Sequence, residues 1–558
     1  MSEPATIVIR AADLQAQLAA EEAEAPSLAK ASGSMAIATL ISRVTGFGWR
    51  LALTVLLGIT ATQDAYNAAN TFPNIIYELF VGNVLTSVMI PVLIKARHDD
   101  EDKGVAYTQR LVTMGTVMLL AVTVLAVACA PLLTSIFVDS STGQSRPEVV
   151  TAFGYLVLPE ILFYGISALF SAILNAQNIF KAPAWAPVAN NLIMFGTLAT
   201  YMIVPGDQDL NPFHITDAKF LVLGIGSSLG VAAQAAVLVP ALVRSGFKLR
   251  PRWGWDKRIG QFGGLMGWAF GYVLVSQVTV WAITRVATGA AGGGLSIYLQ
   301  SWNLLQVPYG VLGVSLLTAI MPKMSQAAAE GDVPGVLDYL SQGSRLTAVM
   351  LVPISALMTV LGPAMGVALF SIKSSESSGA FELGLGVTAS AFLLLPYSVT
   401  LLQLRVFYAF NDSRTPTVLR ALMVAFQVPL TFACPLVLPS QDVVYGIAFV
   451  NGLTFVVGMA MGEIWLRRRF GKLGSRRVVK TYVKTGVSAV WGAAAALAVA
   501  LVVTRYIPGG IHRAGGAWLT VVGGGLLGLV CAFGMMTLLR VHELTPALSR
   551  ITRFVRRT

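Results

Sequence analysis

Apolar segments of about 20 residues recur along this chain from residue 35 to residue 540. A helix needs about that length to cross the hydrocarbon core of a membrane. Of the 558 residues, 55% are hydrophobic and only 12% are charged, too few polar side chains to cover one water-soluble surface. We therefore predict an all-α polytopic membrane protein of about fourteen transmembrane helices.

The segments between the spans separate the chain into regions. Residues 1–33 are rich in Ala and Glu and lack the basic and apolar regions of a signal peptide, so we predict a disordered cytosolic leader. Residues 541–558 form a basic tail. The predicted spans are 35–58, 68–95, 110–137, 148–175, 183–205, 217–245, 261–288, 295–322, 344–370, 384–410, 417–437, 443–466, 482–505 and 515–540.

The basic residues are distributed unequally between the loops on the two sides of the membrane. Of the 39 Lys and Arg residues, about 27 fall in loops on one side of the membrane and about five on the other. This asymmetry predicts that both termini of the multi-pass chain are cytoplasmic. It also explains the net charge of +12 without a nucleic-acid partner.

No residue pattern indicates a catalytic centre. Cys129, Cys434 and Cys531 lie within apolar runs and lack metal-ligand spacing, while all four histidines fall in predicted loops or tails. The spans leave no room for a soluble catalytic domain. We therefore expect a protein that is not an enzyme and that needs no metal or cofactor.

An internal repeat divides the spans into two sets of six. Segments 81–91 and 312–322 match in their Gly and Pro positions. Six intervening helices give both copies the same orientation, so we predict parallel lobes around a central cavity, suited to alternating access. The alternative is a chance likeness of apolar segments. The proposed N-lobe is 34–246, the C-lobe is 247–470, and 471–540 holds two more helices; a second match pairs Pro159, Asn175 and Pro183 with Pro396, Asn411 and Pro416.

Two arginines in the first span are the leading candidates for a binding site. Arg43 and Arg50 share one helix face about 10 Å apart, with Gly46 between them. A guanidinium stays protonated and offers paired donors to a phosphate or diphosphate. The alternative is that both side chains extend to the lipid headgroups.

Each acidic residue in or near the spans has two possible roles, one functional and one structural. Asp64 and Glu78 are either counter-ions of a cavity or structural partners of an arginine. Glu160 follows Pro159, where a helix break would line the cavity unless the carboxyl is a packing group. Arg285, near the end of the seventh span, is expected to meet headgroups.

Several motifs resemble those of the MurJ/MviN family, the lipid II flippases of bacterial peptidoglycan synthesis in the multidrug/oligosaccharidyl-lipid/polysaccharide exporter superfamily. The resemblance covers residues 34–540 and is closest to actinobacterial members. Such members often continue into a cytosolic kinase-like domain, so this chain is either a short version or a truncated one. The motifs are Ser42-Arg-Val-Thr-Gly-Phe47, Thr62-Gln-Asp-Ala-Tyr66, Phe72-Pro-Asn74, Pro91-Val-Leu93, Ala184-Trp-Ala-Pro-Val188, Val307-Pro-Tyr-Gly-Val-Leu-Gly313 and Leu402-Gln-Leu-Arg-Val-Phe-Tyr408.

The resemblance implies a substrate-binding set with marked departures. The family's cavity residues match Ser42, Arg43, Asp64 and Ser296. Family arginines are replaced elsewhere: Trp49 is followed by Arg50, and Tyr77, Glu78 and Asn303 stand where further arginines are common, with Gly82 in place of an acid. The predicted site is therefore Ser42, Arg43, Arg50, Asp64, Glu78, Ser296 and Asn303, without the acidic residues for a sodium site in spans seven and eight.

The resemblance also implies a function. We expect a flippase of the bacterial plasma membrane that moves lipid II, an undecaprenyl- or decaprenyl-diphosphate-linked precursor, from the inner to the outer leaflet. The last two helices would guide the lipid tail. One alternative is a cation-coupled exporter of drugs or of another lipid-linked oligosaccharide. The other is a transport-inactive scaffold that recruits cell-wall synthesis proteins as partners.

Overall fold

The computed structural model describes residues 35, 37–80, 93–102, 104–206, 214–248, 250–254, 263–291, 293–371, 377–471 and 473–544. All regular elements within these ranges are helices, as the apolar pattern predicts. The leader 1–33, the repeat segment 81–91 with Gly82, and most of the basic tail lie outside the described residues.

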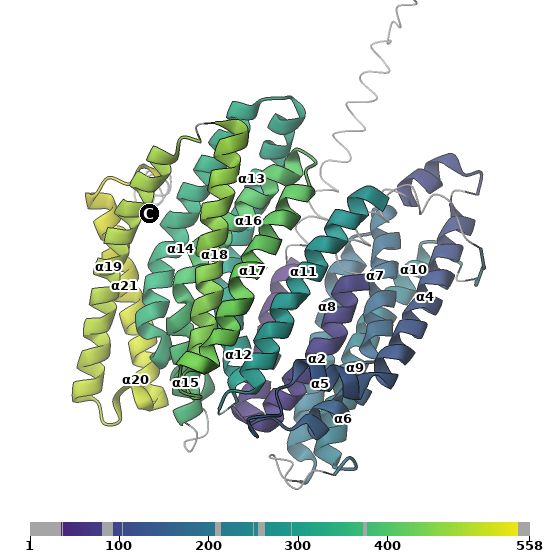
Figure 1. Cartoon of the computed structure of the whole chain (residues 1–558), viewed down its shortest axis with the longest axis horizontal. Coiled ribbons are helices and arrows are strands. Elements are labelled where there is room, and N and C mark those ends of the chain that lie inside the picture. Colours follow the sequence, from purple (N-terminus) through teal and green to yellow (C-terminus); the bar gives the residue numbers. More distant parts are fainter. Residues whose placement is uncertain are drawn as a thin grey trace, which may run out of the picture.

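The first half of the chain forms one group of helices, drawn in purple and blue in Figure 1. The group begins with helix Ile37–Leu57. The helices that follow are α2 (Ala61–Phe80), α4 (Val105–Ala128), α5 (Ala130–Phe137), α6 (Pro147–Val157), α7 (Glu160–Ala176), α8 (Lys181–Ile203), α9 (Ala218–Ala236) and α10 (Leu238–Arg244).

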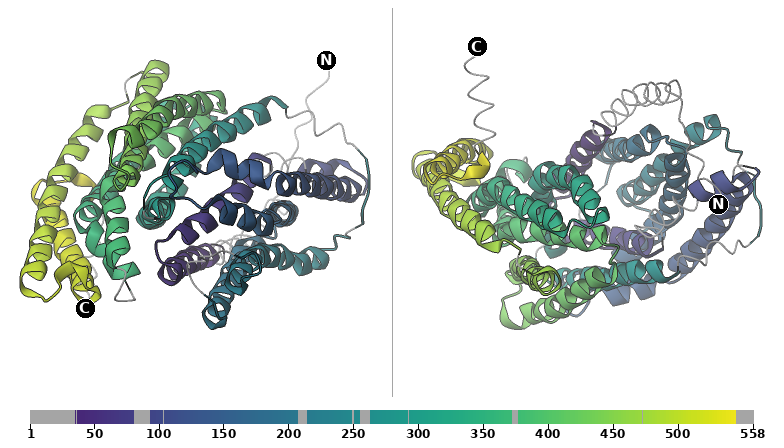
Figure 2. Two further views of the ribbon diagram at one scale, coloured as in Figure 1. Left: turned by 60° about the horizontal axis from the view of Figure 1, so that its bottom comes forward. Right: turned by 90° about the horizontal axis from the view of Figure 1, so that it is seen from above.

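The second half forms the teal, green and yellow groups. Helices α19 and α21 pack against each other and against α14, at one edge of the molecule in Figures 1 and 2. The elements are α11 (Gly263–Thr288), α12 (Gly294–Pro308), η2 (Tyr309–Gly313), α13 (Val314–Ala329), α14 (Val333–Phe370), α15 (Ser377–Ser390), η3 (Ala391–Leu393), α16 (Leu394–Ala409), α17 (Arg414–Val437), α18 (Val443–Phe470), α19 (Ser475–Tyr506), η4 (Gly510–His512), α20 (Ala514–Leu519), η5 (Thr520–Gly524), α21 (Gly525–Leu538) and η6 (His542–Leu544).

Twelve helices in the described ranges are long and apolar enough to cross a membrane. Helices α2 and α8 occupy the places of the second and fifth predicted spans but are not among those twelve, so the count of fourteen stays a prediction. Several spans consist of two helices that meet at a break; for example, α6 ends at Val157 and α7 begins at Glu160, around Pro159.

The two halves repeat one local structure, which supports the predicted repeat. Asn178 after α7 and Asn411 after α16 both adopt the left-handed backbone conformation, with φ of 62° and 56°. In both, the next residue donates its backbone N–H to a carbonyl in the last turn of the helix, which closes the helix end. The next helix begins at Lys181 in one half and at Arg414 in the other. The structure therefore pairs Asn411 with Asn178 and not with Asn175, because the backbone turn defines the equivalence.

The halves meet along a limited set of elements. Helices α2 and α5 of the first half contact α11 and α12 of the second. One hydrophobic core cluster continues across this boundary, from Leu57 and Phe72 to Leu295 and Val444. The two groups of helices are thus joined most firmly at the end of the bundle where α2 and α12 begin.

Candidate functional site between the two halves

Asp64 joins the two halves of the molecule. Its carboxylate, near the start of α2, accepts hydrogen bonds from the backbone N–H groups of Leu295 and Ser296 at 3.2 and 2.7 Å and from the Ser296 hydroxyl at 2.5 Å. The first N–H groups of a helix lack intrahelical partners, and the helix dipole favours a negative charge there. Asp64 is therefore a cap for α12 supplied by the opposite half.

Gly293 makes this approach possible. It precedes α12 with a φ of +76°, a conformation that favours glycine. A Cβ atom at this position would lie 2.6 Å from the Ile59 side chain, so any other residue would push the halves apart.

A second group of hydrogen bonds lies where α5 and α11 end. Arg285 donates to the carbonyl oxygens of Ser135 and Val138, both at 2.7 Å. Trp281 on α11 donates to the Ile136 carbonyl at 3.0 Å. The prediction that Arg285 meets lipid headgroups is wrong, because the carbonyl groups at the end of α5 bind its guanidinium.

Asp139 follows α5 in the same region. Burial alone would raise its pKa, but hydrogen bonds from Ser141 and the positive charge of Arg285 hold the pKa below its usual value. Its backbone N–H donates to the Thr288 hydroxyl at 3.1 Å. The region is thus a polar closure between the halves, which we call the closure and define by Asp64, Asp139, Arg285 and Ser296.

Arg50 reaches across the interface deeper in the bundle. Its guanidinium donates to the Asn303 side-chain oxygen at 3.0 Å. The Asn303 amide donates to Gln300 at 3.2 Å, and Gln300 donates to the Thr54 hydroxyl at 2.6 Å. This chain returns to the first helix, so Arg50 and Asn303 belong to one polar network between helix Ile37–Leu57 and α12.

Arg43 has no hydrogen bond or ion pair to any described residue, and it is exposed. Its guanidinium nevertheless lies against the second half, since a Cβ atom on Gly310 would be 2.3 Å from Nη1. Gly310 lies in η2, near the middle of the apolar helix Gly294–Ala329. Arg43 therefore points across the interface with its donors free to bind an anion.

The remaining predicted site residues, Glu78 and Ser42, do not hydrogen-bond to Arg43 or Arg50. Glu78 is exposed, and within the described ranges neither it nor Asp64 pairs with Arg43 or Arg50. Ser42 contributes its backbone carbonyl, which accepts a 2.9 Å hydrogen bond from Asn191 on α8. Ser42 and Asn191 thus fix the first helix against its own half.

Sequence reasoning missed Gly310, Gln300 and Thr54. The last two are polar residues within apolar helices, a pattern typical of bonds between helices. The close approach of Gly310 to Arg43 carries no such signal, because a glycine in an apolar helix has many possible packing partners.

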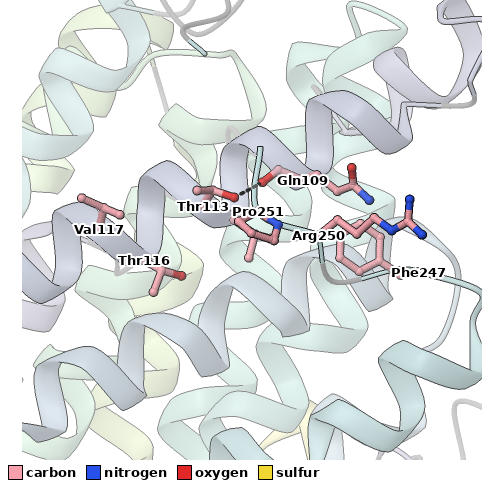
Figure 3. Close-up of a pocket in the computed structure, with 8 residues that line it drawn as sticks. Gln109, Thr113, Thr116, Val117, Phe247, Arg250 and Pro251 are labelled. Atoms are coloured by element: carbon pink, nitrogen blue, oxygen red, sulfur yellow. Dashed lines mark hydrogen bonds between the residues drawn. The ribbon is translucent and has the colours of Figure 1, made fainter. Parts of the chain in front are cut away.

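A pocket of about 270 Å³ lies away from this interface. Figure 3 shows Gln109, Thr113 and Thr116 on α4 lining it opposite Phe247, Arg250 and Pro251. None of the predicted site residues lines this pocket, which lies between α4 and the segment that follows α10. It is therefore a poor candidate for the site of a substrate that must pass between the halves.

Comparison with known proteins gives one consistent family. The family model described as "Lipid II flippase MurJ" matches residues 53–513. The "Probable lipid II flippase MurJ" of Vibrio cholerae is 26% identical over 389 residues, which cover 68% of this chain and 72% of that protein. The protein of the same name from Thermotoga maritima is 24% identical over 445 residues, covering 79% of this chain and 85% of that protein.

Solved structures share the fold. A structure titled "Lipid II flippase MurJ, inward closed conformation" aligns with a TM-score of 0.71 at 16% identity, covering 90% of this chain and 98% of that chain. An inward-facing multidrug resistance MATE family transporter of the MOP superfamily aligns with a TM-score of 0.60 at 15% identity. The alignment covers 79% of this chain and 99% of that chain. The chain is thus a multi-pass membrane protein with the two-lobe transporter fold.

Proposed function

Because the chain belongs to the lipid II flippase MurJ family, we propose that it moves lipid II from the inner to the outer leaflet of the bacterial plasma membrane. The protein breaks no covalent bond in this process and supplies only a path. The observation that carries the proposal is Arg43, a guanidinium without a partner in the described structure that points across the interface between the halves.

Residues 34–246 and 247–470 act as the two lobes, and 471–540 as a separate pair of helices that guides the lipid tail. The matching helix ends at Asn178 and Asn411 support two equivalent lobes. The packing of α19 and α21 against α14, at the edge of the bundle, supports a separate role for the last pair.

Arg43 binds the diphosphate of lipid II, and Arg50 assists. Two guanidiniums on one helix face give charge-assisted, paired hydrogen bonds to phosphate oxygens. Arg50 is exposed and already has a neutral partner in Asn303, which it can exchange for a phosphate oxygen. Asn303 contacts Arg50, and Ser42 adjoins Arg43 in the sequence, so both can shape the polar part of the site; Glu78 is included on the family resemblance alone.

The closure opens and closes the path. The positive-inside pattern of the loops supports cytoplasmic termini, and with that orientation the closure lies at the outer side of the membrane. In the conformation described, lipid II would enter from the inner leaflet, and the lobes would then separate at Asp64 and Ser296. Outward movement of negative charge across an inside-negative membrane gains about 2.3 kcal/mol per charge per 100 mV.

The test uses purified protein in liposomes that contain lipid II. A membrane-impermeant enzyme that cleaves lipid II reports how much reaches the far leaflet. We expect Arg43→Ala to lower the flipping rate at least about tenfold, the loss of one charge-assisted phosphate contact. Arg43→Lys should retain part of the rate, because it keeps the charge but loses the paired donors.

The matched control is Arg505→Ala, an exposed arginine at the end of α19, which should flip lipid II at the normal rate. Full flipping by Arg43→Ala would contradict the diphosphate clamp. Absence of flipping by the unmodified chain would favour the scaffold, and transport that needs a cation gradient but not Arg43 would favour the exporter.

A further inference from the structure

Arg420 places a positive charge within the second half of the molecule, away from the proposed diphosphate site. It is partly buried and lies in the second turn of α17, which is long and apolar enough to cross a membrane. Its Nε atom donates a 3.1 Å hydrogen bond to the Ser276 hydroxyl on α11. Ser276 is near the middle of α11, so the guanidinium lies well inside the apolar part of the bundle.

The Arg420 guanidinium has donors that no described residue uses. Arginine carries N–H donors on Nε, Nη1 and Nη2. Among the described residues, an acceptor is present for Nε alone, and that acceptor is a neutral hydroxyl. Ser276 donates its own proton to the Tyr272 carbonyl at 2.8 Å. None of the ion pairs between described residues includes Arg420, so its charge has no protein counter-ion there.

The helices packed against α17 do not compensate this charge. Helices α11, α16 and α18 contact α17, and Glu463 is the single acidic residue on these three helices. Glu463 accepts a 3.0 Å hydrogen bond from Arg467, near the end of α18. All other charged side chains on the three helices are cations: Arg285 on α11, Arg405 on α16, and Arg467, Arg468 and Arg469 on α18.

Arg420 also lines a small cavity between these helices. The cavity has a volume of about 20 Å³, and Tyr272 and Thr400 bring side chains with hydroxyl groups to its wall. A site of this size admits one water molecule or one ion of similar size, and it excludes a phosphate group or a lipid headgroup. The rest of the wall is largely apolar, from Leu401, Leu404, Leu419, Met423 and Phe455.

We propose that Arg420 and this cavity form a binding site for a small monovalent anion such as chloride. A guanidinium keeps its proton throughout the physiological pH range, and an uncompensated charge within an apolar helix is costly. A chloride ion accepts hydrogen bonds from Nη1 and Nη2 and also neutralises the charge. A water molecule in the cavity accepts the same bonds but leaves the charge uncompensated.

The site joins four helices of one half, because Tyr272 is on α11, Thr400 on α16, Arg420 on α17 and Phe455 on α18. An anion that binds the folded chain and not the unfolded chain stabilises the folded form. Chloride is therefore expected to stabilise the second half. This effect does not depend on lipid II, so it can be tested without a transport assay.

The first experiment measures thermal unfolding of the purified full-length protein in detergent. Sodium chloride at about 0.15 M is compared with sodium gluconate at the same ionic strength, because gluconate is too large for the cavity. We expect the unfolding temperature to be at least about 2 °C higher in chloride, with bromide acting like chloride. Arg420→Gln should lose this difference. Arg414→Gln, which removes an exposed arginine from the same helix, should keep it.

Crystals of the unmodified protein grown in sodium bromide locate the ion directly. Bromide scatters X-rays anomalously, and we expect an anomalous peak within hydrogen-bond distance of Nη1 or Nη2 of Arg420. This measurement and the comparison of chloride with gluconate need no variant, so they decide the question even if Arg420→Gln does not fold.

Three results would overturn the proposal. One is a cavity that holds water and gives no anomalous peak. Another is an equal effect of chloride on the unmodified protein and on Arg420→Gln. The third is a peak in the crystal without any effect of chloride on unfolding, which would mean an adventitious ion only. None of these measurements involves lipid II, so failure here is distinct from failure of the proposed function.

Discussion

The carboxylate of Asp64 and the hydroxyl of Ser296 lie 2.5 Å apart, on opposite sides of the boundary between the two halves. Both residues are buried, with 8% and 0% of their surface exposed. A hydrogen bond to a charged group contributes about 1.5–3 kcal/mol, so this contact is one of the strongest between the halves. It favours the conformation in which the closure is formed.

Asp64→Asn should therefore shift the protein toward conformations in which the closure is open. Spin labels at Thr142 and Ser440, both exposed near the closure, allow the distance between the halves to be measured in a background without native cysteines. We expect a new population at longer distance. Ser296→Ala should have a smaller effect, because Asp64 still accepts the backbone N–H bonds. Identical distance distributions in all three proteins would be evidence against the closure.

Gly310→Ala tests the position of Arg43 without changing the arginine. The added Cβ atom would lie 2.3 Å from Arg43 Nη1, so the guanidinium must move away from the second half. Ala is a better helix former than Gly, so the protein should remain folded. We expect the lipid II flipping rate in liposomes to fall several-fold. Gly534→Ala, where the added atom meets nothing within 4 Å, should flip normally.

Asn411→Ala should destabilise the turn after α16. The left-handed conformation costs an Ala residue about 1 kcal/mol more than it costs Gly, and Asn tolerates it better than most residues. We expect a lower thermal unfolding temperature in detergent for Asn411→Ala and an unchanged or higher one for Asn411→Gly. Asn178→Ala should behave in the same way if the two turns are equivalent.

Acid should weaken the loop between α16 and α17. Burial alone would raise the pKa of Asp412, but hydrogen bonds from Thr415 and the Arg469 guanidinium hold the pKa below its usual value. A carboxyl with a lowered pKa contributes stability that is complete above its unfolded value of about 3.9 and is lost as the pH falls through the folded value.

The measurement for Asp412 is thermal stability as a function of pH. The unmodified protein should be more stable than Asp412→Asn at pH 7, and the difference should vanish as the pH falls below about 4. A difference that stays constant over this range would show that the carboxylate charge contributes nothing.

The sequence predicted the fold class and the family correctly. The all-helical membrane architecture is confirmed, because hydropathy summed over about 20 residues is a local property that needs no tertiary information. Asn191 on α8 bonds to the first helix, as polar side chains within apolar spans commonly do. Helix bounds were less accurate: α14 begins at Val333, before the predicted span at 344–370, because a helix can continue beyond the membrane with polar residues.

The sequence selects candidate residues for the site but does not show which of them pair. Arg43, Arg50 and Asp64 were selected because charge in or near an apolar helix is costly and therefore informative, whereas Ser296 was selected through the family resemblance. The sequence did not predict the partners of these residues. Asp64 and Glu78 were considered as partners of arginine, whereas Asp64 binds Ser296 and Leu295. Arg285 was assigned to headgroups, whereas it binds the end of α5.

The amino-acid sequence by itself determined that this chain forms apolar helices, repeats them and carries arginines inside the first. Only the tertiary structure decided that Arg50 meets Asn303, that Arg43 lies against Gly310 and that Glu160 lacks a partner. The reason is that a helix that is apolar all round has no sequence signal for its rotation about its own axis. That rotation is set by packing against helices hundreds of residues away, and it decides which polar side chains meet.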